Sequence, residues 1–347
     1  MQSVKSYSIM IILMICSSIS LSQPANNILK GKIINVKTGE PLIGVNVYVN
    51  NSTTGTTTSK NGLYEMMLPD GRYEIVVSII GYETESKFIN IKNKIERRLD
   101  FALKEKTYEL NQVSVEGEFS QEWYKMLKLF KIYLLGQNEF SRLCKIQNEK
   151  DIYFLGNYDS VFTIHSYRPL TISNNALGYL MECSLTKFEI DTKNMISSYS
   201  IKTRFTDLIR TGSNAGKDWI ANRRSAYIGS LRHFLYSAIT KNELKDFEVA
   251  LVKQTNYNEK GIRVYSRDEI STLSVEQADY LLSFKGLLRV RYKFSNNCSW
   301  IEIDSIDSND SYVNWNGYLL NPMSVLQYGT WAYSGMAMLL PLDYISF

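Results

Sequence analysis

Hydrophobic residues in the first part of the chain fall in short runs, which are separated at intervals of roughly eight to twelve residues by glycine, proline or asparagine. Within one run, Val45, Val47 and Val49 alternate with more polar positions, the period of a strand with one buried face. Regularly spaced strands and turns predict an all-β sandwich. The expected strands are residues 31–36, 45–49, 56–58, 63–68, 73–79, 88–91 and 97–103.

The pattern changes after residue 119. Ser120 is a candidate cap for a helix that runs to residue 135 and ends at Gly136. Its apolar residues recur at helical spacing. Strand-like runs follow, and residues 217–240 read as one or two helices, so we expect an α+β domain with a mostly antiparallel sheet. The later strands are expected at 152–155, 161–165, 179–190, 198–204, 247–252, 280–294, 300–303 and 312–319.

The first 22 residues have the layout of a secretory signal peptide. Lys5 precedes an apolar run at 9–16, and small residues stand at Ser20 and Ser22. We expect export with cleavage after Ser22, because the peptidase accepts small side chains at these two positions. Lipidation of Cys16 is the alternative, but the bulky residue before it disfavours this. No apolar stretch is long enough for a transmembrane helix, and membrane association stays open.

Charge and cysteine content narrow the functional classes. Lys and Arg exceed Asp and Glu by only four, whereas a nucleic-acid binder needs a strongly basic face, so we expect no nucleic-acid partner. Without its signal the chain keeps Cys144, Cys183 and Cys298 and contains no CxxC motif. The two histidines, His165 and His233, lie outside any HExxH or HxxE motif. We therefore expect no metal, no cofactor and no carboxypeptidase active site.

Residues 28–104 contain four ordered motifs: Thr38-Gly39-Glu40-Pro41-Leu42-x-Gly44-Val45, Gly55-Thr56-x-Thr58-x-x-Asn61-Gly62-x-Tyr64, Pro69-x-Gly71-x-Tyr73 and Gly81-Tyr82. Together they resemble the motifs of the carboxypeptidase-regulatory-like domain. This family is a seven-stranded, transthyretin-like β-sandwich with a carbohydrate-binding-like fold, common in secreted and outer-membrane proteins of the Bacteroidetes. The resemblance implies an interaction module without its own catalytic centre, and residues 23–118 indeed contain neither His nor Cys.

The expected organisation is a two-domain, mainly β protein: signal peptide 1–22, sandwich 28–104, linker 105–118 and an α+β domain of unknown function at 119–347. The last part contains the strings Trp219-x-x-x-Arg223 and Leu340-Pro341-Leu342-Asp343-Tyr344. With these it resembles the region that follows the sandwich in Bacteroidetes envelope proteins. That resemblance extends the architecture to the whole chain and implies no mechanism.

A candidate binding face lies on the segment around residue 230. Asn222, Ser230, His233 and Ser237 share one side of a continuous helix if the helix spacing holds throughout. Such a face either packs closely against a neighbouring strand or lines a shallow polar pocket with His233 at its base. A packed, structural role is the interpretation that lone histidines usually support.

The sequence favours a non-enzymatic binding or assembly protein of the cell envelope, located in the periplasm, at the outer membrane or on the surface. Its partner would be an unknown envelope protein or glycan. The alternative is an uncharacterised enzyme that processes envelope glycan or peptide at a site near His233.

Overall fold

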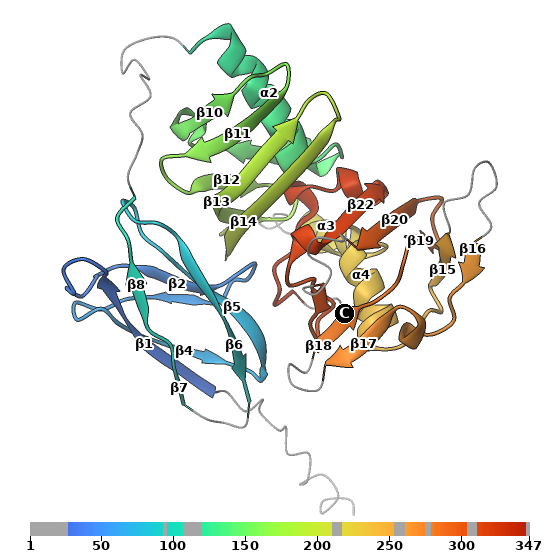
Figure 1. The fold of residues 1–347 in the computed structure, drawn as a ribbon, viewed down its shortest axis with the longest axis horizontal. Coiled ribbons are helices and arrows are strands. Elements are labelled where there is room, and N and C mark those ends of the chain that lie inside the picture. Colours follow the sequence, from blue (N-terminus) through green and yellow to red (C-terminus); the bar gives the residue numbers. More distant parts are fainter. Residues whose placement is uncertain are drawn as a thin grey trace, which may run out of the picture.

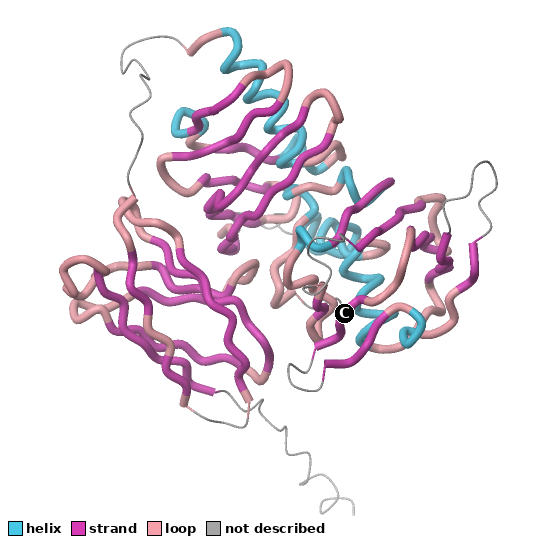
Figure 2. The backbone as a smooth tube through the Cα atoms, in the orientation of Figure 1, coloured by secondary structure: helices cyan, strands magenta, loops and turns pink. Residues whose placement is uncertain are grey.

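The structure is a computed structural model that describes residues 27–92, 96–106, 119–209, 217–252, 261–274, 279–303 and 311–344. The expected signal peptide and most of the expected linker, residues 107–118, lie outside these ranges. Strands predominate along the chain (Figure 2), and the predicted fold class, a mainly β protein with an N-terminal sandwich and a second mixed part, is confirmed.

Residues 27–106, here called the sandwich, form two sheets around one core. One sheet has the order β4-β1-β7, with β8 also paired to β1, and the other has the order β3-β2-β5-β6. Leu29, Ile33, Val47 and Ile75 are fully buried between the sheets. The strands are β1 (Asn27–Asn35), β2 (Asn46–Val49), β3 (Gly55–Thr57), β4 (Leu63–Leu68), β5 (Gly71–Ser78), β6 (Glu85–Ile91), β7 (Arg97–Arg98) and β8 (Phe101–Leu103).

All seven strands expected in the sandwich correspond to strands of the structure, with one split in two. The expected strand 97–103 is interrupted at Leu99, whose N–H bonds to the carbonyl oxygen of Lys30, so that β7 and β8 pair separately with β1. Both of these pairings are parallel, whereas β1 and β4 are antiparallel.

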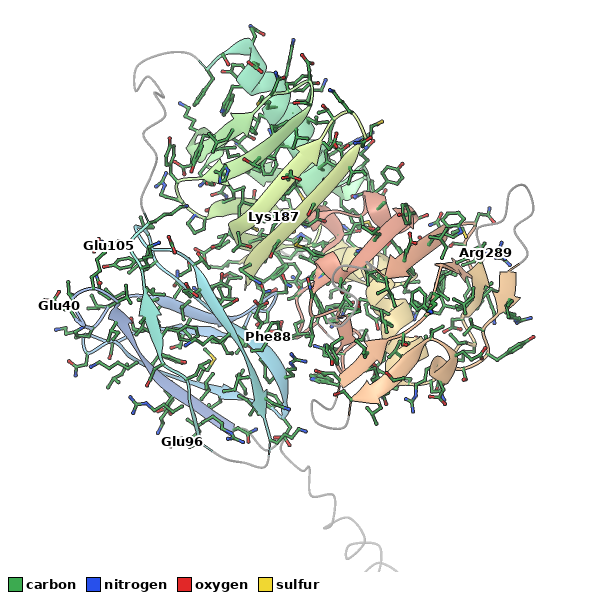
Figure 3. All side chains as sticks on the ribbon, viewed as in Figure 1. Glu40, Phe88, Glu96, Glu105, Lys187 and Arg289 are labelled. Carbon is green, nitrogen blue, oxygen red and sulfur yellow. The ribbon has the colours of Figure 1, made fainter. Side chains whose placement is uncertain are left out.

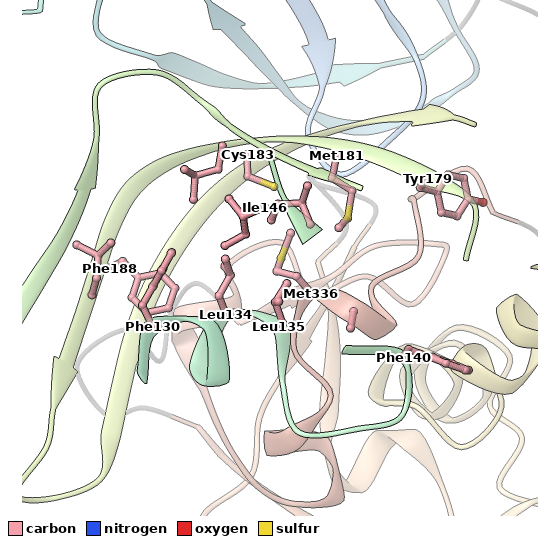
Figure 4. Packing of buried hydrophobic residues seen from close by; sticks show 14 of the residues in the cluster. Phe130, Leu134, Leu135, Phe140, Ile146, Tyr179, Met181, Cys183, Phe188 and Met336 are labelled. Carbon is pink, nitrogen blue, oxygen red and sulfur yellow. The ribbon is translucent and has the colours of Figure 1, made fainter. Parts of the chain in front are cut away.

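The central lobe, residues 119–227, packs helix α2 (Gln121–Leu135) on an antiparallel sheet. Ser120 accepts a hydrogen bond from the Trp123 N–H, and Gly136 ends the helix, as predicted. Phe130 and Leu134 of α2 face Phe188 and Met181 of the sheet (Figure 4). The other elements are β9 (Cys144–Ile146), β10 (Ile152–Gly156), β11 (Val161–Ser166), β12 (Leu170–Asn174), β13 (Tyr179–Asp191), β14 (Ile196–Asp207) and α3 (Lys217–Tyr227).

The C-terminal lobe, residues 231–335, has a core of its own around Phe234, Leu288 and Ile301. A five-stranded sheet of order β16-β15-β19-β20-β22 and a three-stranded sheet of order β17-β18-β21 surround helix α4 (Leu231–Leu235) and a π-helical turn at Tyr236–Thr240. The strands are β15 (Phe247–Val252), β16 (Gly261–Arg263), β17 (Ser271–Ser274), β18 (Asp279–Leu282), β19 (Leu287–Tyr292), β20 (Cys298–Ile303), β21 (Tyr312–Val313) and β22 (Val325–Gly329).

Two strand predictions in the second half are wrong in extent. The run 280–294 is two strands that belong to different sheets, β18 and β19, because the chain bends between them where Gly286 adopts φ +84°. The run 312–319 is a strand only at Tyr312–Val313, since the side chain of Asn314 accepts hydrogen bonds from two following N–H groups and turns the backbone. Strands β9, β12, β16, β17 and β22 were not predicted.

Across the described ranges, each helix is too short or too polar to cross a bilayer. After the C-terminal lobe, the chain returns to the other two parts. Met336 and Leu340 join the core of the central lobe, and Leu342 packs against the core of the sandwich. We call residues 336–344 the C-terminal segment.

The separate core of the sandwich predicts that residues 23–104 fold without the rest of the chain. The isolated fragment should unfold cooperatively in urea, with the far-ultraviolet circular dichroism of a β protein. Circular dichroism during the titration measures this, and a non-cooperative transition would place the domain boundary elsewhere.

Candidate functional site

A buried carboxylate connects the sandwich to the central lobe. Glu74 on β5 is 8% exposed. It accepts hydrogen bonds from Asn50 Nδ2 at 2.7 Å, Ser86 Oγ at 2.6 Å and Lys202 Nζ at 2.5 Å. Three donors, one of them charged, compensate for removing the carboxylate from water. Because Lys202 belongs to β14, this cluster fixes the position of the sandwich against the central lobe.

The backbone adds a second connection beside this cluster. The Asn51 N–H donates to the Thr203 carbonyl oxygen at 2.7 Å, and the Phe205 N–H donates to the Ser52 carbonyl oxygen at 2.9 Å. The turn between β2 and β3 therefore lies along the free edge of β14, where it continues the hydrogen-bonding pattern of the sheet.

The C-terminal segment connects the same turn to helix α4. Arg232 donates hydrogen bonds to the carbonyl oxygens of Pro341 at 2.7 Å, Leu342 at 2.9 Å and Tyr344 at 2.9 Å. The Leu342 N–H in turn donates to Asn51 O at 2.5 Å. Burial lowers the pKa of Arg232. The guanidinium thus links the C-terminal lobe to the sandwich through one short piece of chain.

These contacts surround a cavity of about 320 Å³, here called the junction cavity. Residues of all three lobes line it, so it exists only while the lobes are docked. Phe88 of β6 lies on the side of the sandwich that faces the C-terminal lobe (Figure 3). The wall includes Glu74, Phe88, Tyr199, Lys202, Leu231 and Leu340.

Another polar contact joins the sandwich to the C-terminal lobe. Arg72 Nη1 lies 3.4 Å from Asp279 Oδ2, and its guanidinium is 5.0 Å from the ring centroid of Phe88 and 5.3 Å from that of Tyr312. Asp279 is 1% exposed. Burial raises the pKa of Asp279 to about 6, although Arg72 opposes the shift.

The continuous helix that the candidate binding face assumes is not present. α3 ends at Tyr227, and Gly229 turns the chain with φ +74° before α4 begins. Ser230 caps α4 by accepting the His233 N–H at 3.1 Å, and His233 Nδ1 accepts the Gly229 N–H at 3.0 Å. Both side chains therefore stabilise the turn between the helices.

The other two members of that face lie apart. Asn222 donates to the Ala176 carbonyl oxygen at 2.9 Å, and the Ser237 carbonyl oxygen accepts the Glu243 N–H at 2.8 Å. Of the four residues, only Ser230 lines the junction cavity. Ser230 also lines a larger pocket, of about 1120 Å³, near Tyr292. A binding role for the four together stays a prediction.

The surroundings of His233 are aromatic. Its ring centroid lies 5.0 Å from those of Tyr227 and Phe247 and 5.8 Å from that of Tyr292. Burial lowers the pKa of His233, and the charge of Asp246 opposes this shift. Because Nδ1 accepts a hydrogen bond, the proton of the neutral ring is on Nε2. Among the described residues, no group of three His, Cys, Asp or Glu side chains is placed to hold a metal ion.

Sequence reasoning did not identify Glu74, Lys202 or Arg232. A signal existed for Glu74, which is the only charged residue in the apolar run 73–79, and an acid at such a position requires partners. Lys202 and Arg232 each lie within two residues of another polar or basic side chain, so neither stands out as a lone charge in an apolar run.

Residues 29–115 match the family model of the CarboxypepD_reg-like domain. The chain carries a CarboxypepD_reg-like domain. It is 35% identical over 109 residues to the TonB-dependent receptor SusC of Bacteroides thetaiotaomicron, which covers 31% of this chain and 10% of that protein. It is also 33% identical over 72 residues to carboxypeptidase E of Caenorhabditis elegans, and this match covers 19% of this chain and 15% of that protein. The matches thus span less than a sixth of either relative.

Solved structures with local similarity include proteins from Bacteroides species. A DUF3823 family protein of Bacteroides ovatus is 14% identical, covers 53% of this chain and 82% of its own, and has a TM-score of 0.19. A putative carbohydrate binding protein of Bacteroides uniformis is 10% identical, covers 53% and 80%, and has a TM-score of 0.21.

The turn between α3 and α4 generates a test of whether Ser230 and His233 act structurally. Ser230→Leu removes the helix cap and overpacks the cavity wall, so the free energy of unfolding should fall by about 1–3 kcal/mol. His233→Gln should cost less, because the amide oxygen can still accept the Gly229 N–H. Urea denaturation measures both, with Ser230→Thr as the control that keeps a hydroxyl cap. A His233→Gln protein as stable as wild type but inactive in the cell would instead assign the histidine to a functional site.

Asp279 predicts a pH dependence of stability. Its pKa is higher in the folded chain than in the unfolded chain, so the folded state binds more protons between these two values. The contribution of Asp279 to the free energy of unfolding should therefore fall as pH rises from about 4 to about 6, by roughly 1–3 kcal/mol. The free energy of unfolding is measured by denaturation at several pH values, and subtracting the values for Asp279→Asn isolates the contribution of Asp279. Arg72→Met removes the charge that lowers the pKa of Asp279, so the loss of stability should continue to higher pH. An unchanged pH range would exclude Arg72 as the partner of Asp279.

Proposed function

We propose that this chain is an exported protein of the cell envelope that acts by binding or assembly rather than catalysis, with the CarboxypepD_reg-like domain as its docking module. The partner is an envelope protein or glycan. The observation that carries the proposal is the family match at residues 29–115.

The nature of the two relatives supports a non-catalytic domain. One is named as a receptor and the other as a carboxypeptidase, and each shares only a short segment with this chain. A segment present in proteins with such different activities is expected to supply neither of them. In this chain, residues 23–118 also lack the His and Cys side chains that metal or nucleophilic chemistry uses most often.

The sandwich is docked through β5, and this leaves the sheet that contains β1 and β4 available to a partner. Glu74 and Arg72 of β5 contact the other lobes, whereas β1 and β4 lie on the far side of the sandwich from β14 and β18 (Figure 1). β4 is at the edge of its sheet, and Met67 on it is 63% exposed. An edge strand offers unpaired N–H and C=O groups to a partner strand.

Photo-crosslinking in intact cells tests this role. A benzoylphenylalanine at Met67 should give a higher-mass adduct on irradiation, while the same residue at Leu273, which is 55% exposed on the C-terminal lobe, should give none. Equal adducts from both positions would contradict docking through the sandwich.

Mass spectrometry of the envelope fraction should find an N-terminus at Gln23, and a chain without residues 1–22 should stay in the cytoplasm. A lipidated Cys16 would contradict cleavage after Ser22.

A further inference from the structure

The junction cavity has mostly apolar walls. Leu235 and Leu340 are 1% and 4% exposed, and Leu319 and Trp331 also line the space. Its volume of about 320 Å³ is at the lower end of the range for small-molecule sites, roughly 300–1,000 Å³. Apolar walls around such a volume favour a ligand with an apolar body, because its transfer from water contributes the binding free energy.

The charged groups that line the cavity already have partners. Glu74 and Lys202 form an ion pair at 2.5 Å, and Arg232 donates to the carbonyl oxygens of the C-terminal segment. A charged ligand would lose its hydration without gaining an unpaired counter-charge in the wall, and this is costly in a buried site. An uncharged ligand avoids that cost.

Two hydrogen-bond donors remain on the wall for a polar end of the ligand. The ammonium group of Lys202 has three N–H bonds, and one of them donates to a carboxylate oxygen of Glu74. The Ser230 hydroxyl accepts the His233 N–H and keeps its own O–H to donate. Both donors match an oxygen acceptor such as a hydroxyl, ether or carbonyl.

We propose that the junction cavity binds a small, uncharged and largely apolar molecule with an oxygen acceptor at one end. The ligand contacts all three lobes at once, so its binding stabilises the docked arrangement. This inference goes beyond the proposed function, because it concerns a small molecule inside the chain and not a macromolecule docked on the sandwich.

Displacement of a neutral dye from the full-length mature chain tests the ligand class. N-phenyl-1-naphthylamine should gain fluorescence on binding, and decan-1-ol should displace it at a concentration about tenfold lower than decanoate or decylammonium, which corresponds to about 1.4 kcal/mol. Absence of dye binding, or a charged competitor that displaces the dye at the lowest concentration, would overturn the proposal.

Two matched charge variants separate the cavity from general hydrophobic binding. Glu74→Gln leaves Lys202 without its counter-charge, so the affinity for decanoate should rise relative to the affinity for decylammonium. Lys202→Gln leaves Glu74 without its counter-charge, so the ratio of these two affinities should shift in the opposite direction. We expect shifts of at least about threefold in opposite directions. Equal ratios in both variants would show that the competitors bind elsewhere.

A third variant blocks the space directly. Leu231→Trp at the start of α4 should fill the cavity and abolish dye binding, while Leu273→Trp, outside the cavity, should leave it unchanged. Thermal denaturation checks that both variants are folded. Dye binding that survives in a folded Leu231→Trp protein would overturn the proposal, and if this variant does not fold, the charge variants and the competitor series still decide it.

Discussion

The docking of the sandwich on the central lobe centres on one buried carboxylate. Glu74 lies between β5 and β14, and its charge is tolerable only because Asn50, Ser86 and Lys202 all donate to it. Displacing the sandwich would leave Glu74 or Lys202 without its counter-charge at the interface. Hydrogen bonds are directional, so the cluster fixes the position of the sandwich more narrowly than an apolar contact of similar area.

Apolar packing and polar docking have separate roles in this chain. Each lobe has its own buried hydrophobic cluster, whereas the contacts of Arg72, Glu74 and Arg232 between lobes are ionic or directed at carbonyl oxygens. Polar interfaces of this kind are typical of domains that fold independently and then associate. The junction cavity lies where these two kinds of contact meet.

The sequence predicted what is encoded locally. Alternation located the strands of the sandwich, and Ser120 with Gly136 delimited α2, because period and capping act over a few residues. Short strands were predicted less consistently, because a period of two is hard to recognise over three to five residues: β3 and β10 were predicted, whereas β9 and β12 were missed. Gly229 was read as part of a helix because a glycine inside a periodic segment does not reveal its φ.

The candidate site was not predictable for a different reason. Glu74 and Lys202 are 128 residues apart in the chain, and no local pattern specifies which basic residue meets a buried acid. The carbonyl oxygens that Arg232 binds belong to a segment more than 100 residues later. Such pairs follow from tertiary packing, so the cavity that they surround could be found only in three dimensions.

The turn between β2 and β3 has a consequence for how the chain reaches this structure. β14 pairs with β13 on one side, and its other side meets Asn51 and Ser52 of the sandwich. An uncovered edge of this length is a template for strand pairing between molecules. The sandwich precedes β14 in the chain, so it can fold before β14 has emerged, whether from the ribosome or from the export channel. A circular permutant with the sandwich moved behind residue 344 would leave the edge of β14 uncovered while the chain emerges and should aggregate more readily.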